Sequence, residues 1–223
     1  MKKISISIEY QPRIDAWESG NPLLLTAIPE IAGGGSVSRI PELERYQLSP
    51  EQTKVYDAIL ASRGSLHGPF RAWLHSPALA ERAQRLGEEV RFHTTLSARL
   101  RELAILVTAR FWDAQLEWSL HEPLAREAGI PRSAIEDVKH RRAPTLEDRA
   151  EEAVYHYTSN LLRDHFVDDN VYAEASERIG TRGLTELTIL IGYYSLVALS
   201  LNAFRVSVPP DMRPLLPDAP GER

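Results

Sequence analysis

The sequence predicts an all-α protein, and three observations lead to this prediction. Capping residues followed by proline, or by glutamate or glutamine three positions later, recur from Ser49 onward, and such patterns start helices. Between them, apolar residues recur three and four positions apart, as on one face of a helix. The alternation of apolar and polar residues typical of strands is nearly absent after residue 47. With 223 residues, 43% of them hydrophobic, the chain can form one sizeable core.

The helices can be placed in order from their start and stop signals. The predicted starts carry a capping residue or lie close to one, and they are Ser49, Ser76, Ser97, Ser133, Thr145, Asp168 or Asp169, and a position near Thr185. The predicted ends are about Phe92 for the second helix, Gly129 for the segment that follows Ser97, about Asp164 for the helix from Thr145, and a position before Pro209 for the last. Because Pro123 falls inside this pattern, we expect the backbone to bend there or to start a new helix.

The first 47 residues differ from the rest of the chain. They combine a short alternating run around Ile6 with Asn21-Pro22 and the turn-forming stretch Gly33-Gly34-Gly35-Ser36. This density of turn-formers predicts an extended N-terminal arm or a loose leader. The sequence therefore divides into an arm over 1–47, a helical domain over 48–208 and a tail over 209–223.

Two predicted apolar helices contain similar segments of sequence. The segment Arg101–Leu106 (RELAIL) is similar to Thr185–Leu190 (TELTIL), which predicts an internally duplicated helical bundle. When the second segment is aligned with the first by a shift of 84 residues, Leu201 falls at the position of Glu117 and Arg205 at that of His121. The second copy therefore lacks the Glu–His pair of the first. Chance similarity between two leucine-rich helices is the alternative.

Composition excludes several classes of function. A net charge of −5 argues against a general nucleic-acid binder, which needs a basic surface. The absence of cysteine excludes disulfides, thiolate metal sites and thiol redox chemistry in this chain. No histidine pair has the spacing and carboxylate neighbours of a metal site, so we expect none. The start does not resemble a signal peptide, and the most apolar stretch, 184–204, carries Glu186 and Asn202, so we expect a cytoplasmic protein with no membrane partner.

One stretch of sequence has residues suited to catalysis. If the helix from Ser97 runs unbroken, Arg110, Glu117 and His121 lie on one face with the small Ala114 between them, and Glu102 lies near that face. A carboxylate four residues before a histidine can orient the imidazole and raise its basicity, which suits proton transfer at neutral pH. Arg110 could bind a substrate carboxylate through two hydrogen bonds. The alternative is a solvated pair, with Arg110 serving as a structural partner of Glu117 or Asp113.

Four further residues are candidates for lining a substrate pocket. Trp118 adjoins Glu117, whereas Tyr193, Tyr194 and Asn202 lie in the last apolar helix. Buried tyrosine hydroxyls usually find a hydrogen-bond partner, so they could face a ligand. Ordinary core packing is the alternative for each of them.

The run Arg101–Val138 resembles the core motif of the carboxymuconolactone decarboxylase and AhpD-like superfamily. In that motif a Glu-Leu-x-Ile-Leu helix leads into Glu-x-x-x-His-x-x-x-Ala-x-x-x-Gly. The matching positions here are Glu102 to Leu106, then Glu117, His121, Ala125, Gly129 and the following Ile130. The resemblance is specific over 97–140, looser over 66–205, and absent from 1–47. It implies an AhpD-like helical bundle that assembles as homo-oligomers, typically trimers or hexamers.

The resemblance also points to one branch of that superfamily. The peroxidase branch has Cys-x-x-Cys-x-x-x-His, and alignment on His121 places those cysteines at Ala114 and Glu117, so this chain is not a thiol peroxidase. The decarboxylase branch keeps the glutamate and the histidine. It implies a lyase without cofactor that removes carbon dioxide from a small carboxylated lactone, with His121 as proton donor, Glu117 orienting it and Glu102 as a second carboxylate. A hydrolase or isomerase on a related ring and a non-catalytic oligomeric binding protein are the alternatives.

Overall fold

The computed structural model describes residues 38–209 and 212–217. Over these ranges the chain forms helices and no strand, which confirms the predicted all-α class. Most of the predicted N-terminal arm, residues 1–37, lies outside the described residues.

Eight α-helices and one short 3-10 helix make up the described part of the chain. They are η1 (Arg45–Gln47), α1 (Pro50–Arg63), α2 (Phe70–Trp73), α3 (Pro77–Phe92), α4 (Ala98–Phe111), α5 (Gln115–Glu127), α6 (Arg132–Lys139), α7 (Arg149–Asp164) and α8 (Asp169–Phe204).

The predicted starts at Ser49 and Ser97 are confirmed. The Ser49 side chain accepts the amide of Gln52, and the Ser97 side chain accepts that of Leu100. The cap between them, Ser76, precedes α3 but makes no side-chain capping bond.

Two predicted boundaries are wrong. α6 starts after Pro131 instead of at the Ser133 box. α7 starts at Arg149 instead of near Thr145, because Asp148 accepts the amides of Ala150 and Glu151 at 2.8 and 3.0 Å. Pro123 lies inside α5, so no new helix starts there, which was one of the two outcomes expected at this position.

The long helix α8 contains both of the last two helices expected from the sequence. Its N-cap is Asp168, and Gly180 interrupts the helical backbone with φ of 69°. The left-handed conformation at this position suits glycine, which has no Cβ. Gly180 thus separates the predicted short helix from the final one, which begins a few residues before Thr185.

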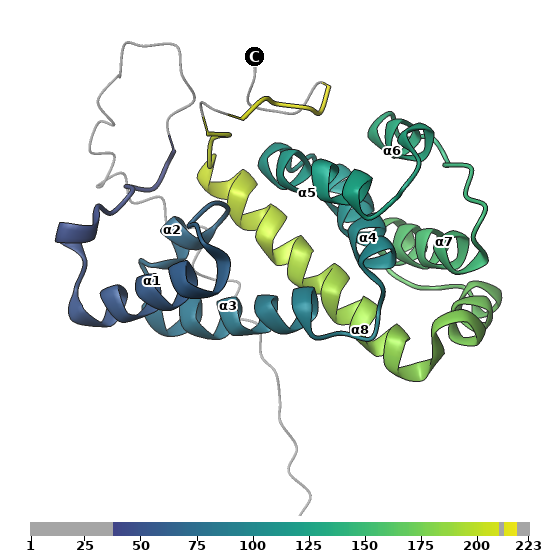
Figure 1. Cartoon of the computed structure of the whole chain (residues 1–223), viewed down its shortest axis with the longest axis horizontal. Helices are drawn as coiled ribbons and strands as arrows, with labels where there is room; N and C mark the ends of the chain where they lie inside the picture. Colours follow the sequence, from purple (N-terminus) through teal and green to yellow (C-terminus); the bar gives the residue numbers. More distant parts are fainter. Residues whose placement is uncertain (1–37, 210–211, 218–223) are drawn as a thin grey trace, which may run out of the picture. The chain divides into compact units, whose positions relative to one another are not determined.

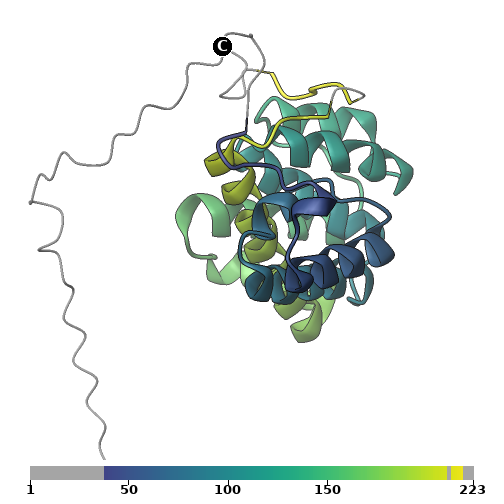
Figure 2. The same cartoon turned by 90° about the vertical axis from the view of Figure 1, so that its left-hand side faces the viewer.

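α8 is the central element in the arrangement of the helices. Figure 1 shows the second part of α8 crossing between α1–α3 on one side and α4–α7 on the other. Figure 2 shows the side formed by α1–α3 facing the viewer. α4 packs against α5, α7 and α8. The two similar sequence segments, 101–106 on α4 and 185–190 on α8, therefore lie on helices in direct contact. The two helices differ after these similar segments, because α4 ends at Phe111 whereas α8 continues to Phe204.

α4 is buried on every side. All residues from Glu102 to Ala109 are buried, which places the helix at the centre of the main core. A smaller core under α1–α3 includes Ile59 and Leu74, and Trp73 packs against both cores. The Trp73 indole donates to Ser200 of α8 at 2.9 Å and so ties α2 to the long helix.

The apolar character of α8 follows from its place in the core. Within the described residues, α8 is the one helix long and apolar enough to cross a membrane, and half of its most apolar window is buried. Its side chains Leu187, Leu190 and Ala198 are completely buried among neighbouring helices. This burial is typical of a core helix.

The packing of α8 leads to a prediction about stability. Leu187 is 0% exposed, so Leu187→Ala should lower the free energy of unfolding by about 2–5 kcal/mol, because it leaves a cavity in the core. The matched control, Leu79→Ala, removes the same atoms from a side chain that is 67% exposed and should change the free energy by about 0.5 kcal/mol or less. Urea unfolding of both variants measures the difference, and equal effects would contradict the assignment of α8 to the core.

Candidate active site

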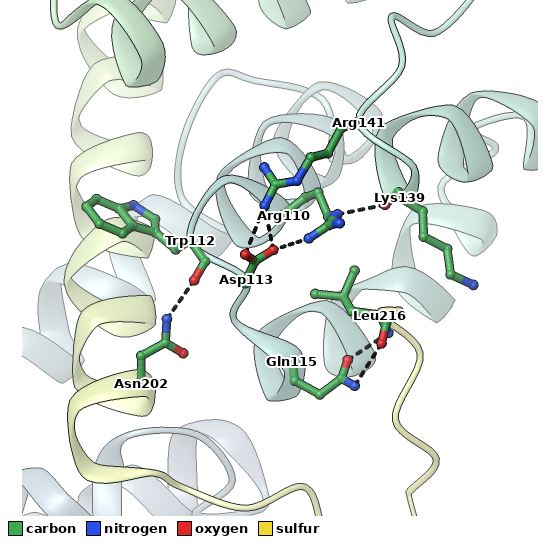
Figure 3. Close-up of polar contacts among 8 residues, drawn as sticks. All are labelled: Arg110, Trp112, Asp113, Gln115, Lys139, Arg141, Asn202 and Leu216. Carbon is green, nitrogen blue, oxygen red and sulfur yellow. Dashed lines mark hydrogen bonds and ion pairs between the residues drawn. The ribbon is translucent and has the colours of Figure 1, made fainter. Parts of the chain in front are cut away.

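A sharp turn separates α4 from α5. Asp113 has φ of 52°, in the left-handed region, and ends the helical path after Trp112. The Asp113 carboxylate contacts Arg110 and accepts two hydrogen bonds from Arg141 at 2.7 and 2.9 Å (Figure 3). The Asn202 side chain of α8 donates to the Trp112 carbonyl at 2.6 Å. These contacts give the turn polar partners from α4, the α6–α7 loop and α8.

The turn overturns the predicted stripe of polar residues. An unbroken helix would hold Glu102 and His121 roughly 28 Å apart, at 1.5 Å per residue. Because α5 folds back along α4, the Glu102 carboxylate instead contacts the His121 ring. Arg110 does not share their face: its Nε donates to the Lys139 carbonyl at 2.6 Å, and it contacts Asp113 (Figure 3).

His121 lies between two carboxylates. Its Nδ1 is 2.6 Å from Oε2 of Glu102, and its Nε2 is 3.0 Å from Oε1 of Glu117. All three side chains are buried, with exposed fractions of 3%, 7% and 4% for His121, Glu102 and Glu117. The Tyr194 ring meets the imidazole edge to face at a centroid distance of 5.1 Å. The predicted orienting pair is therefore a triad, in which Glu102 comes from α4.

The two carboxylates set the protonation state of the histidine. Burial by itself lowers the pKa of His121, but hydrogen bonds to Glu102 and Glu117, together with their charges, outweigh it and raise the pKa from 6.5 to about 9. His121 is therefore an imidazolium at neutral pH, donating one N–H to each glutamate. The two ring protons are thus held between buried carboxylates.

A cavity of about 200 Å³ lies beside Glu117 and His121. α5 and α8 contribute Glu117, His121, Tyr193 and Tyr194 to its wall. The remainder of the wall includes Arg63 of α1, His67 of the loop after α1, and Arg91 of α3. Glu102 contacts the far nitrogen of the imidazole and is not part of this wall.

Two other residues proposed from the sequence lie outside the cavity. Trp118 is completely buried in the main core, and Asn202 binds the α4–α5 turn. Sequence reasoning missed Arg63 and Arg91, because no local pattern marks an arginine near a helix end as pocket-lining. Their approach to His121 depends on the packing of α1 and α3. Over residues 38–209 and 212–217, no group of three or more His, Asp or Glu side chains is arranged to hold a metal ion.

The triad predicts a distinct pH dependence. Because the pKa of His121 is raised in the folded state, its contribution to stability is fully present below about pH 6.5 and is lost as the pH rises through about 9. The loss should amount to roughly 3 kcal/mol between these limits. NMR titration of the His121 ring should show the imidazolium persisting to about pH 9.

Two substitutions separate the contributions of the carboxylates. Glu102→Gln should lower the pKa of His121 more than Glu117→Gln, because the contact with Glu102 is the shorter, at 2.6 against 3.0 Å. The exposed His156→Gln, on α7, should leave the titration of His121 unchanged. A neutral His121 ring at pH 7 in the unmodified protein would contradict the triad.

Comparisons with known proteins agree with this fold. Residues 77–159 match the Carboxymuconolactone decarboxylase family. A comparison with curated proteins gave no significant match.

Several solved structures share the helical arrangement. An uncharacterised peroxidase-related protein with an AhpD core from Ralstonia eutropha aligns with a TM-score of 0.64 and 13% identity, over 78% of this chain and 94% of that chain. The debrominase Bmp8, as an alanine variant in complex with 2,3,4-tribromopyrrole, aligns with a TM-score of 0.63 and 13% identity, over 78% and 95% of the two chains. An AhpD-related protein of unknown function from Agrobacterium tumefaciens aligns with a TM-score of 0.56 and 16% identity, over 62% of this chain and 95% of that chain.

The family match spans α3 to α6 and most of α7, and therefore includes Glu102, Glu117 and His121. The helices that complete the cavity, α1 and α8, lie outside it. Residues 77–159 are thus similar to the carboxymuconolactone decarboxylase family, and the described part of the chain, whose sequence contains no cysteine, has an AhpD-like all-helical fold.

Proposed function

We propose that the protein is a cytoplasmic, cofactor-independent lyase that removes carbon dioxide from a small carboxylated lactone or related acid. The observation that carries this proposal is the buried His121 ring, whose two nitrogens contact Glu102 and Glu117 at the wall of a cavity. Such a group supplies a proton and a positive charge at the same position.

The reaction needs both of these properties. When the bond between the ring and the carboxylate breaks, its electron pair moves toward the lactone carbonyl and leaves an enolate. The imidazolium stabilises that developing negative charge in a site of low dielectric. His121 then donates its proton to the ring carbon, and the neutral histidine is reprotonated after product release. The substrate serves as its own electron sink, so the scheme requires no cofactor.

The two glutamates take different roles in this scheme. Glu102 contacts Nδ1 from the side away from the cavity, so it is a positioning residue that fixes the ring and its charge. Glu117 lines the cavity and contacts Nε2, the nitrogen that we assign to face the substrate. In the proposed step, Nε2–H leaves its hydrogen bond with Glu117 and transfers the proton to the substrate, and Glu117 then passes a proton taken from solvent to the neutral ring.

The size of the cavity favours a small substrate. Pockets for drug-sized ligands range over roughly 300–1,000 Å³, whereas this cavity is about 200 Å³. The debrominase of the same fold is described in complex with a tribromopyrrole, a planar five-membered ring. Tyr193 and Tyr194, whose rings meet edge to face at 5.5 Å, line this cavity and would form one wall against a lactone of the same ring size.

Two other functions use the same residues. A hydrolase or isomerase on a related ring would need the proton transfer without loss of carbon dioxide, and a binding protein would need neither. Detection of carbon dioxide together with solvent deuterium in the product distinguishes the lyase from both, because only decarboxylation with protonation at carbon gives the two signals together.

The proposal predicts the kinetics of three variants. With carboxymuconolactone as the test substrate, His121→Gln and Glu117→Gln should lower kcat by about 10²–10⁴-fold, the range of general acid–base groups. Glu102→Gln should shift the alkaline limb of the pH–rate profile to lower pH, because it lowers the pKa of His121. The matched control is Glu127→Gln, an exposed glutamate of α5 that should turn over normally. Unimpaired decarboxylation by His121→Gln would exclude this site.

We also propose that the protein self-associates through α8. Ile189, Leu196 and Leu199 are 44%, 44% and 48% exposed, and with Gly192 and Ala203 they follow each other at intervals of three and four residues. This spacing forms an apolar stripe along one helix face, as in helices that pack against a partner helix. No charged residue occurs from 187 to 204. A second copy of the chain presents the same apolar stripe.

Light scattering of the purified protein should therefore give a trimer or a larger assembly. Leu196→Glu should shift the measured mass toward that of the monomer, because a charge would be buried between the α8 helices of two copies. The control, Phe166→Glu, changes a side chain that is 81% exposed between α7 and α8 and should leave the mass unchanged. A monomer at micromolar concentration in the unmodified protein would contradict self-association.

A further inference from the structure

Two buried polar atoms near the cavity have no hydrogen-bond partner among the described residues. They are the hydroxyl oxygen of Tyr193 and Nε of Arg63, and both residues line the cavity. Tyr193 is 5% exposed, so its hydroxyl has little access to bulk water. Buried polar groups in native proteins are rarely left without a partner, and such groups call for a physical explanation.

Arg63 is held in place by contacts that leave Nε available. Its Nη2 donates to the Gln84 carbonyl of α3 at 3.3 Å, and the guanidinium lies 4.8 Å from the centre of the Phe70 ring. Arg91 lines the same cavity, near the Phe92 ring, and has no hydrogen bond or ion pair within the described part of the chain. Two guanidinium groups thus reach the cavity without a carboxylate bound to either.

Gly87 of α3 makes room for this arrangement. A Cβ at this position would lie 2.1 Å from the Tyr193 hydroxyl and 2.8 Å from Nη2 of Arg63. Both groups therefore lie over the same helical residue, which must lack a side chain. The close approach explains a glycine in the middle of a helix, where it is otherwise unfavourable.

The tyrosine is suited to donate a hydrogen bond. Burial raises its pKa to about 12, the nearby Arg63 and Arg91 oppose this shift, and Glu117 adds to it. The hydroxyl thus stays protonated at neutral pH. Together with the two arginines it provides hydrogen-bond donors close to the proton-transfer residues.

We infer that Arg63, Arg91 and Tyr193 form a carboxylate-binding subsite that positions the substrate against His121. Arginine binds a carboxylate through paired, charge-assisted hydrogen bonds, and the unpartnered Nε and hydroxyl are the donors that such a ligand would satisfy. This subsite takes the role that the sequence had assigned to Arg110. The inference rests on the proposed function for the kind of substrate, but binding itself requires no turnover.

The subsite binds a carboxylate that the product retains. Cations bound to the departing carboxylate would stabilise the ground state, in which that charge is present, more than the transition state, in which it moves into the ring. The ring carbon that loses carbon dioxide belongs instead near His121, because His121 protonates this carbon and the negative charge develops in the ring. Arg63 and Arg91 thereby determine which end of the substrate faces the proton donor.

Binding of furan-2-carboxylate to the full-length protein tests the subsite. This probe is a five-membered ring with a carboxylate, and its methyl ester is a neutral control of similar shape. Calorimetry should show that the acid binds and that the ester binds at least about tenfold more weakly. Arg63→Gln, Arg91→Gln and Tyr193→Phe should each weaken binding of the acid by about tenfold or more.

Two comparisons keep the test decisive. Arg71→Gln changes an arginine of α2 that pairs with Glu42 at 3.5 Å and does not line this cavity, so it should bind the probe normally. Tyr193→Phe removes only an unpartnered hydroxyl, so its melting temperature should match that of the unmodified protein. Equal affinity for acid and ester, no binding of either, or unchanged affinity in all three subsite variants would overturn the inference.

Failure of the carboxylate-binding subsite can be distinguished from failure of the proposed function. If Arg63→Gln loses probe binding while no lactone is decarboxylated, the subsite stands and the lyase proposal fails. If decarboxylation depends on His121 while the arginine variants keep their affinity for the probe, the lyase proposal stands and the subsite is wrong.

Discussion

The left-handed turn at Asp113 is the constraint on which the site depends. It folds α5 back along α4, and so brings Glu102 within 2.6 Å of His121 although 18 residues separate them in the sequence. A non-glycine residue in this conformation is strained, and asparagine and aspartate adopt it more readily than most residues. Here Arg110 and Arg141 bind the Asp113 carboxylate, and Asn202 holds the preceding carbonyl. Arg110 and Asn202 thus act at a distance from the cavity by fixing the turn that forms it.

The buried charges follow from this geometry. An ionised group in a core is strongly destabilised unless it is paired, and α4 carries Glu102 on a helix that is otherwise apolar and buried. His121 provides its partner, and Glu117 occupies the second nitrogen. The three groups therefore depend on one another, and removal of the histidine would leave two buried carboxylates without a cation. This mutual dependence explains why a protein without metal-ligand clusters in its described part can keep an imidazolium inside its core.

The sequence predicted the local features well and the long-range ones poorly. The caps at Ser49 and Ser97 are short-range hydrogen-bond patterns, and the structure has them as predicted. The Glu117–His121 pair is also local, because four residues on a helix place both on one face. The break at Asp113 was missed, because Arg110 to His121 reads equally well as one continuous helix, and its partners Arg141 and Asn202 are distant in the sequence. Arg63 and Arg91 were missed for the same reason, since only the packing of α1 and α3 against α8 brings them to the cavity.

The division of the cavity between helices has a functional consequence. The family segment supplies the triad and Arg91, whereas Arg63 and Tyr193 come from α1 and α8, outside the match. Under the proposed mechanism, changes in α1 and α8 would alter recognition of the substrate and leave proton transfer intact. The claim that Glu102 acts through His121 is tested most directly by a double-mutant cycle in kcat with Glu102→Gln and His121→Gln. The account predicts that the double variant is no slower than His121→Gln. The effects of the two substitutions on the activation free energy should then be non-additive by at least about 1.4 kcal/mol, which is a factor of ten in kcat. Fully additive effects would contradict the account.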